Sequence, residues 1–505
     1  MTDLQLDTLE ARGLIRIATF QPELEYFFRH ALLQDAAYES LLKQERRSLH
    51  HVVGEALEDI YPDRVGEMAA ILGMHFELAG DREKALRYLF AAAKFAGERN
   101  AIVESYDLFS RAGALLPEAA DDDEVTRKMR LEIELGRARS GFAFMSETAL
   151  LEILEPLVPL SARVGDLRLE ADVHLAIALY RQLRGERTSE HPELERSLKR
   201  VAEIADELND PLIGALPQSI VGLSKVFNGD LRGGVEVLEK AAPQLEQKQD
   251  FVGSSFAMMA LAQGYARMGD FDKADAVLKR SEELAQKGDI IARLDTLIGN
   301  SMVRAIKGDI DQAVPIAKEC TDLAEEAGAI ACVVASNYVL GDAYMRQNKF
   351  GDAKIALDRS NEVATSLEQH TFRPSIVALT KLNASHLGDP NSPGSFEEAL
   401  AEAREVNDPW AEATIKWNRA QTAAHEGDGG DTEQMLSDFE FAASAFEQME
   451  APPFRARVER DWGNALRALG RTAEGDEKLG AALALFDGMG IVREADEIRA
   501  TLGQS

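Results

Sequence analysis

The sequence predicts an all-α fold, a right-handed α-solenoid of paired helices, behind a small N-terminal segment that holds one β-hairpin. Short phrases ending in Gly-Asp recur about every forty residues, for example at Gly229, Gly269 and Gly308, and this period is typical of helical solenoids. Between these phrases, apolar residues are spaced three and four apart, which indicates helices. An array of repeats also accounts for a length of 505 residues, which exceeds the usual size of one compact domain.

The N-terminal segment, residues 1–60, has a different pattern. Leu4–Arg12 is predicted to form a helix that Gly13 ends. Two short apolar runs, "LIRIATF" and "ELEYFF", flank "QPE" and predict a β-hairpin, and a further helix is predicted from about Ala31. Helix, hairpin and helix in this order form the end of a winged-helix unit. We therefore expect residues 1–60 to be a winged-helix remnant followed by a junction helix.

The rest of the chain divides by the regularity of its pattern. Residues 211–505 carry regular repeats of about 40 residues, whereas residues 61–210 carry irregular ones, interrupted by polar stretches at Leu116–Val125 and Leu183–Leu194. In the regular part, Gly can adopt the left-handed conformation that ends one helix, and the following Asp can cap the next. We expect an elongated superhelix of helix pairs from about Tyr61 to the C-terminus.

Small residues recur where the two helices of a unit must approach closely. Gly73, Ala262 and Gly341 each follow a Leu and stand three residues before a Phe or Tyr. This pattern, continued by a Gly-Asp turn, an aromatic residue and Ala, resembles the tetratricopeptide repeat. The resemblance implies that the small residues let antiparallel helices meet, and that the first helix of each unit lines a concave groove. The period is longer than that of the standard unit, as in the repeats of large signalling ATPases.

The junction that follows the hairpin resembles a family of signalling proteins. The segment "YFFRHALLQDAAYESLLKQERRSLHHVVGEALE", Tyr26–Glu58, is similar to the one that joins a winged helix to tetratricopeptide repeats in bacterial STAND-type ATPases, especially those that also carry a class III adenylate/guanylate cyclase domain. The matching residues are Gly13, Leu14, Ile15, Phe28, Arg29, His30, Ala31, Leu32, Tyr38, Leu41, Leu42, Arg46, Arg47, Leu49, His50 and Glu58. The resemblance covers the whole chain, but only the C-terminal half of that family's architecture.

The sequence lacks the motifs of the family's catalytic domains. It contains no G-x-x-x-x-G-K-[ST] phosphate loop and no recognisable pair of cyclase metal-binding carboxylates. In the family those domains would precede Met1, so we expect either a split or truncated gene product or a free-standing regulatory module. The motifs G-x-S-x-G, H-E-x-x-H and C-x-x-C are also absent. The protein is therefore predicted not to be an enzyme and to have no cofactor.

The histidines near the junction are predicted to have structural roles rather than to bind a metal. His50 and His51 are adjacent, so on a helix their side chains point about 100° apart and do not easily face one ion. We expect His30 and His50 to orient the junction by hydrogen bonds. His75 has no neighbouring ligand residue in the sequence, and a packing role is expected for it.

Composition restricts the classes of partner. The formal net charge is −31, which argues against binding to nucleic acid or to an anionic membrane, because these need clustered Lys and Arg. The one basic cluster, "KQERRSLHH", is surrounded by acidic residues, and no apolar run approaches the roughly 20 residues that span a bilayer. Cys320 and Cys332 lie in apolar stretches and are expected to be buried thiols, which suits a cytoplasmic protein.

The register of the repeats assigns side chains to the groove. Arg267 and Arg346 occupy equivalent positions and stand out in so acidic a chain, while Tyr338 and Trp417 add aromatic surface. Arginine pairs with carboxylates and aromatic residues bury apolar area, so the expected partner is a protein or peptide that carries acidic and apolar groups. The candidate groove residues are Gln263, Arg267, Tyr338, Asp342, Arg346, His386, Trp417 and Gln421.

Three functions remain open at this level. The first is a non-enzymatic sensor and protein-interaction module of a signal-transduction system, which regulates a cyclase or a STAND ATPase and whose partner is an upstream polypeptide of that kind. The second is a fragment of an adenylate/guanylate cyclase that lacks its catalytic domains. The third is the effector-sensing arm of a transcription regulator.

Overall fold

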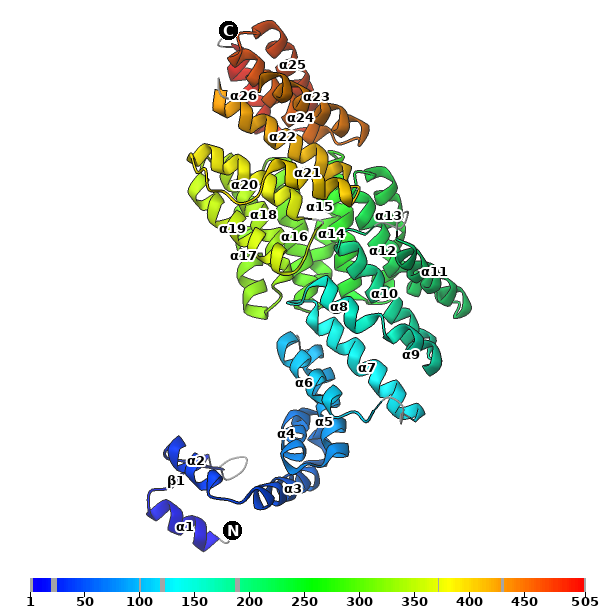
Figure 1. Cartoon of the computed structure of the whole chain (residues 1–505), viewed down its shortest axis with the longest axis vertical. Coiled ribbons are helices and arrows are strands. Elements are labelled where there is room, and N and C mark those ends of the chain that lie inside the picture. The colour runs from blue at the N-terminus through cyan, green and yellow to red at the C-terminus, as the bar shows by residue number, and fades with distance from the viewer. Residues whose placement is uncertain are drawn as a thin grey trace. The chain divides into compact units, whose positions relative to one another are not determined.

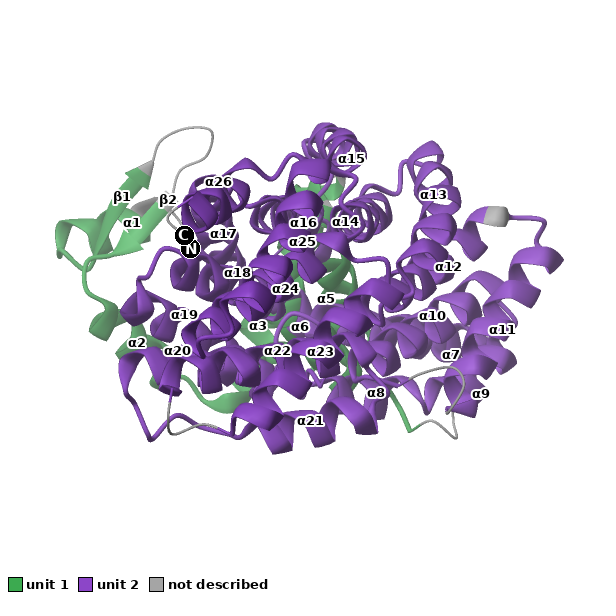
Figure 2. Ribbon diagram, turned by 90° about the horizontal axis from the view of Figure 1, so that it is seen from above, with its two compact units in different colours: residues 1–95, 107–121 green, residues 96–106, 122–505 purple. Residues whose placement is uncertain are grey.

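The computed structural model describes residues 3–19, 25–99, 101–118, 123–186, 191–370, 372–427 and 431–503 (Figure 1). It confirms the predicted fold class: the described residues form an α-solenoid of helix pairs with one antiparallel hairpin near the N-terminus. The chain forms two compact units (Figure 2). Unit 1 is Met1–Phe95 with Asp107–Asp121, and unit 2 is Ala96–Tyr106 with Asp122–Ser505. The division at residues 60 and 210 follows the regularity of the sequence and stays a prediction.

Unit 1 begins with the expected helix, hairpin and helix. Gly13 ends the first helix with a left-handed φ of +70°, and Ile15 pairs with Phe28 in the hairpin. The junction contains two helices, because the backbone N–H of Leu42 donates to the carboxylate of Glu45 and a new helix starts there. The elements that lie wholly or partly in unit 1 are α1 (Asp3–Ala11), β1 (Ile15–Thr19), β2 (Glu25–Phe28), α2 (Ala31–Glu39), α3 (Lys43–Ile60), a 3-10 turn (Pro62–Arg64), α4 (Val65–Ala79), α5 (Arg82–Glu98) and α6 (Ile102–Ala114).

The junction helix α3 packs against α4, the first long helix after the expected start of the array at about Tyr61. Gly54 on α3 makes this possible, because a Cβ at this position would lie 2.7 Å from the ring of Phe76. The expected close approach at Gly73 is present as well, where an added Cβ would meet the side chain of Leu89 at 2.9 Å.

Unit 2 contains the regular helix pairs. Its further helices are α7 (Glu124–Gly141), α8 (Glu147–Leu154), α9 (Leu157–Val164), α10 (Leu167–Leu183), α11 (Pro192–Glu207), α12 (Pro211–Phe227), α13 (Leu231–Gln247), α14 (Phe251–Arg267), α15 (Phe271–Ala285), α16 (Ile290–Lys307), α17 (Ile310–Ala327), α18 (Ala331–Arg346), α19 (Phe350–Ser366), α20 (Arg373–Leu387), α21 (Phe396–Glu405), α22 (Pro409–Glu426), α23 (Thr432–Gln448), α24 (Pro452–Ala468), α25 (Thr472–Met489) and α26 (Val492–Gly503). From α12 on, each even-numbered helix up to α24 forms a pair with the helix that follows it. None of the described helices is long and apolar enough to cross a membrane.

The turns between paired helices have the predicted chemistry. Gly229 and Gly269 take left-handed φ angles of +86° and +81°, which other residues rarely adopt. Asp230 and Asp270 then accept a hydrogen bond from a backbone N–H in the first turn of the next helix. At the opposite ends of the units, where the sequence has Asn-Asp, the asparagine takes the left-handed conformation, as Asn407 does with φ +48°.

The superhelix of unit 2 closes on itself, which the sequence analysis did not anticipate. Arg232 on α13 forms an ion pair with Glu450, which lies 218 residues further along the chain. Three glycine turns of the early repeats contact side chains of the last repeats: the pairs are Gly229 with Met449, Gly269 with Met489, and Gly308 with Glu494. Each repeat turns a little relative to the one before, so the C-terminal helices meet the turns of the first repeats and cover the groove.

A buried acid in the core of unit 2 makes stability depend on pH. Asp295 on α16 is 8% exposed, and its Oδ2 accepts a hydrogen bond from the hydroxyl of Ser255 at 3.3 Å. Burial raises the pKa of Asp295 from 3.8 to about 8. The folded protein therefore keeps a proton that the unfolded chain releases at lower pH, so this residue makes folding less favourable as the pH rises from about 4 to about 8.

Replacing Asp295 with asparagine should remove this dependence, because the amide has no proton to lose. We expect Asp295→Asn to raise the free energy of unfolding by about 5 kcal/mol at pH 8 and to change it little at pH 4. Urea unfolding at both pH values measures the two effects, with Asp270→Asn, which replaces the capping residue of α15, as the control. Equal effects of Asp295→Asn at the two pH values would contradict the assigned protonation.

Candidate functional site

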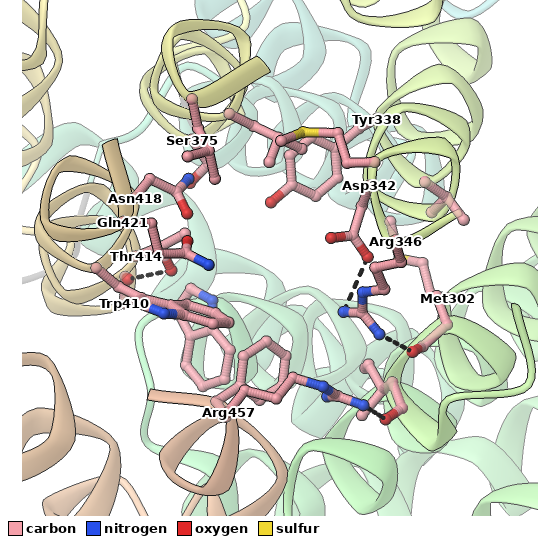
Figure 3. Close-up of a pocket in the computed structure, with 18 of the residues that line it drawn as sticks. Met302, Tyr338, Asp342, Arg346, Ser375, Trp410, Thr414, Asn418, Gln421 and Arg457 are labelled. Carbon is pink, nitrogen blue, oxygen red and sulfur yellow. Dashed lines mark hydrogen bonds and ion pairs between the residues drawn. The ribbon is translucent and has the colours of Figure 1, made fainter. Parts of the chain in front are cut away.

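A cavity of about 320 Å³ lies in unit 2, inside the closed superhelix (Figure 3). We call it the inner cavity, and its walls come mainly from α14, α16, α18, α20, α22 and α24. All eight candidate residues from the sequence line it: Gln263, Arg267, Tyr338, Asp342, Arg346, His386, Trp417 and Gln421. The register of the repeats thus predicts which helix faces line the inner cavity, while the binding of a partner there stays a prediction.

Two walls of the inner cavity face each other in Figure 3. Tyr338, Asp342 and Arg346 lie on one side, on α18. The opposite side carries Ser375 on α20 and a row of side chains from α22, and Arg457 of α24 lies below both. The row from α22 consists of Trp410, Thr414, Asn418 and Gln421.

Arg267 is a cation enclosed by aromatic rings and by the backbone of the preceding repeat. Its Nη1 donates to the carbonyl oxygen of Val226 at 2.8 Å. Its guanidinium carbon lies 4.0 Å from the ring centre of Trp410 and 5.3 Å from that of Phe227. Burial lowers the pKa of Arg267 to about 10, and the nearby Asp408 acts in the opposite direction. The side chain therefore remains charged at neutral pH.

Arg346 has the equivalent place two repeats further along the array, but it forms an ion pair. Its Nη1 donates to the carbonyl oxygen of Ala305 at 2.9 Å, and its Nη2 lies 2.9 Å from Asp342 Oδ2. Both arginines thus bind the end of the first helix in an earlier repeat. The sequence predicts them only as groove side chains. Their hydrogen bonds to the neighbouring helix ends are not predictable from local pattern, because the carbonyl groups that they reach belong to other repeats.

Two further arginines come from α24, and the sequence analysis did not select them. Arg457 is 2% exposed, and its Nη2 donates to the carbonyl oxygen of Ile306 at 2.7 Å and to Glu494 Oε1 at 2.8 Å. Arg460 donates from Nε to Asp461 Oδ1 at 2.8 Å. The candidate residues from the sequence end at Gln421 on α22, one repeat before the helix that carries both arginines.

Asp461 organises one end of the inner cavity. Its Oδ2 accepts a hydrogen bond from Trp417 Nε1 at 3.0 Å and one from Gln421 Nε2 at 2.8 Å. These bonds fix the indole and the amide of two predicted residues, so that the carbonyl oxygen of Gln421 is the group left to accept a further bond. On the same helix, α22, Thr414 lies three residues before Trp417, Asn418 three before Gln421 and Trp410 four before Thr414, and this helical spacing could have identified them.

Two polar atoms on the wall of the inner cavity are buried without a hydrogen-bond partner among the described residues. They are Oε1 of Gln263, a residue that is 1% exposed, and Nη1 of Arg457. Buried polar groups in proteins are usually bonded, and an unbonded one costs about 1–3 kcal/mol. An acceptor and a donor that both line one cavity are therefore available to a bound molecule.

His386 and Tyr338 are uncharged parts of the wall at neutral pH. The ring of His386 stacks on Phe350 at 4.4 Å between ring centres and contacts His425 at 4.1 Å. Burial, followed by the charge of His425, lowers the pKa of His386, so the imidazole is neutral at pH 7. Burial raises the pKa of Tyr338, which keeps its hydroxyl as a hydrogen-bond donor.

The remaining sequence candidates have structural positions. His50 lies 3.0 Å from the hydroxyl of Tyr38 through Nε2 and 2.9 Å from His75 Nδ1 through Nδ1, so His75 takes part in the hydrogen bonding of the junction rather than only in packing. Within the part of the chain that the structure describes, no group of three metal-ligating residues is assembled. Cys320 and Cys332 are buried free thiols, as predicted.

Comparisons with known proteins give no family assignment. No protein-family model matches the chain. A curated relative, an uncharacterized protein of Rhizobium meliloti (strain 1021), is 25% identical over 158 residues, which are 31% of this chain. The match spans 15% of that relative's own length. The resemblance to STAND-type ATPases and cyclases therefore rests on the junction residues Tyr26–Glu58 and the repeat pattern.

Two solved structures are similar over most of their length. One is a Rap protein complexed with competence and sporulation factor, with a TM-score of 0.36 and 9% identity, covering 80% of this chain and 98% of that one. The other is the apo form of the quorum sensor NprR from B. thuringiensis, with a TM-score of 0.41 and 13% identity, covering 70% of this chain and 97% of that one.

Proposed function

We propose that this protein is a non-enzymatic sensor and protein-interaction module of a cytoplasmic signalling system, and that it binds a peptide or a segment of a protein partner in the inner cavity. The observation that carries the proposal is a pair of buried atoms without a hydrogen-bond partner in the described part of the chain, Gln263 Oε1 and Arg457 Nη1, in two residues that line this cavity. Their unmet hydrogen bonds would be satisfied by a polar chain that enters between the two walls.

The size of the inner cavity favours a short segment over a folded domain. Its volume of about 320 Å³ lies at the lower end of the 300–1,000 Å³ that is usual for ligand pockets. The aromatic side chains of Trp410, Trp417 and Phe454 supply apolar surface on one side. A chain terminus or a short peptide with apolar side chains suits this space.

The lining residues supply recognition chemistry rather than a reaction centre. Asp342 is held by Arg346 and His386 is fixed in an aromatic stack, so neither is placed as a free base beside a nucleophile. The alternatives are a fragment of an adenylate/guanylate cyclase and the sensing arm of a transcription regulator. A regulated cyclase or STAND ATPase polypeptide is the partner that the junction residues favour.

Nucleotide binding separates the proposed module from a chain with ATPase activity. Because the sequence has no phosphate loop, we expect isothermal titration of the chain with Mg-ATP to show no saturable heat. A micromolar dissociation constant would contradict this expectation and favour an enzymatic function.

Filling the inner cavity tests the proposed function directly. Ser375 lines this cavity (Figure 3), so the larger side chain in Ser375→Trp should occupy its space. When the chain is crosslinked to its partners in the native lysate, this variant should capture none of them. The matched control is Ile355→Trp, which places the same side chain on the outer face of α19, where Ile355 is 72% exposed. Capture that survives Ser375→Trp, with the fold intact by circular dichroism, would show that partners bind elsewhere.

A further inference from the structure

The four arginines of the inner cavity differ in how their charges are balanced. Arg346 is paired with Asp342, and Arg460 with Asp461. Arg457 is likewise paired with Glu494. For Arg267, by contrast, the described residues supply only the carbonyl oxygen of Val226 and two aromatic rings, and the structure records no ion pair.

A buried guanidinium is costly when no carboxylate is paired with it directly, because burial removes water from the charge. The charge of Asp408 favours the charged form of Arg267, but the structure records no ion pair between the two, and the Asp408 carboxylate accepts from the backbone N–H of Ala411 at the start of α22. Among the described residues, Arg267 therefore has no direct carboxylate partner, and it lies at the wall of the inner cavity next to the rings of Trp410 and Phe227.

A second observation lies one helical turn away. Gln263 and Arg267 are four residues apart on α14, so their side chains share one face of the helix and their Cβ atoms are about 5–6 Å apart. Oε1 of Gln263 is buried and has no donor among the described residues. Gln263 and Arg267 both line the inner cavity, so its wall combines a cation with a neighbouring hydrogen-bond acceptor.

We propose that the inner cavity binds a ligand with a single carboxylate on an apolar body, with Arg267 as the residue that holds the carboxylate and Gln263 accepting a hydrogen bond from a neighbouring N–H of the ligand. This inference rests on the proposed function and specifies the ligand of the same site. One guanidinium without a direct carboxylate partner matches one anionic group, whereas a second carboxylate of the ligand would itself be buried unpaired. The rings around Arg267 bury the apolar part.

Two kinds of molecule share this chemistry. The C-terminal residue of a short peptide has a carboxylate for Arg267, an amide N–H on the same Cα atom for Gln263, and a side chain for the aromatic rings. It therefore matches all three features of the wall. A free organic acid with a phenyl or branched alkyl group supplies the carboxylate and the apolar body, but has no N–H for Gln263. The test must therefore separate a peptide terminus from a simple acid.

Three pools of compounds distinguish a peptide C-terminus from a simple acid. They are N-acetylated apolar tripeptides with free C-terminal carboxylates, the same tripeptides as C-terminal amides, and a set of phenyl and branched alkyl carboxylic acids. The full chain is mixed with each pool, and the shift of its melting temperature is measured. We expect the free-acid tripeptides to raise the melting temperature most, the simple acids to raise it less, and the amides to leave it unchanged.

Variants of Arg267 assign the carboxylate to this residue. In Arg267→Gln the charge is lost, and the affinity for the best free-acid tripeptide should fall about 30-fold or more, as expected for the loss of one partner of a buried charge pair. Arg267→Lys should retain part of the affinity because it retains the charge. Arg304→Gln is the control, since Arg304 lies on α16 outside the inner cavity and pairs with Asp275.

The outcomes distinguish the ligand class from the proposed function. If the amides stabilise the chain as well as the acids do, and Arg267→Gln responds like the wild type, the inner cavity binds peptides but the carboxylate inference is wrong. If no pool shifts the melting temperature, the inference is also wrong, while the Ser375→Trp experiment still decides the proposed function. A stronger response to the simple acids than to the tripeptides would overturn the role of Gln263.

Discussion

Arg457→Ala is expected to lower the free energy of unfolding by about 3–5 kcal/mol, because it leaves the partner of a buried ion pair without its counter-charge. Glu494 is 6% exposed, and Arg457 balances its charge. The attraction of Arg457 and Arg346 lowers the pKa of Glu494 against the opposing effect of burial. The same substitution removes the donor to the carbonyl oxygen of Ile306, which lies 151 residues away in the chain.

The damage should appear where the superhelix closes. Arg457 links α24 to the end of α16, so hydrogen exchange in Arg457→Ala should become faster at the turns after α12, α14 and α16 as well as in α23–α26. Urea unfolding measures the loss of stability. The control is Arg499→Ala, whose ion pairs with Asp487 and Asp496 are largely exposed and contribute little.

A rescue variant separates the buried charge from simple loss of packing. Arg457→Met combined with Glu494→Gln removes both charges and keeps most of the side-chain volume, so it should recover much of the stability that Arg457→Ala loses. If Arg457→Ala is as stable as Arg499→Ala, the contact between α24 and α16 does not hold the closed superhelix together.

Gly341→Leu is expected to destabilise unit 2 by about 3 kcal/mol or more through overpacking. Even a Cβ at this position would lie 2.5 Å from Cγ of Leu357 and would overlap its Cδ2, so a leucine must push α18 and α19 apart. The same arrangement recurs at Gly222 with Leu238 and at Gly463 with Leu479, always sixteen residues apart. Because repeats stabilise their neighbours, the loss should spread to the adjoining helix pairs.

Two controls accompany this variant. Gly351→Ala adds a side chain on α19 where no atom lies within 4 Å, so it should be neutral or slightly stabilising. Lys349→Ala removes an exposed side chain before the same helix and should also change little. Thermal unfolding of the three variants is sufficient for the comparison. Equal melting temperatures would mean that α18 and α19 do not pack at Gly341.

Much of the inner cavity could be predicted because the repeat places equivalent residues at equal intervals. The positions of Arg267, Arg346 and Tyr338 on the inner face of their helices follow from the same register that placed Gly341 and Ala262 between paired helices. Local sequence is sufficient for these positions, because helical spacing selects the inward face of each helix and the glycine turns fix where each helix ends.

The state of those side chains could not be predicted in the same way. Arg267 and Arg346 look equivalent in the sequence. In the structure, however, Arg346 is paired with Asp342, whereas Arg267 lies near the rings of Phe227 and Trp410. Trp410 reaches Arg267 only because α22 lies across the inner cavity from α14. A side chain whose partner is more than a hundred residues away leaves no local pattern.

The sequence by itself determined the helix pairs, their register and the inward faces that carry Gln263 and Arg267, since each depends on spacing within about forty residues. Only the tertiary structure decided that the array closes, that Arg457 of α24 bonds the end of α16, and that α24 adds a wall to the groove. The reason is physical: a small rotation between successive repeats accumulates along the array. Its sum sets which distant turns meet, and no single repeat encodes that sum.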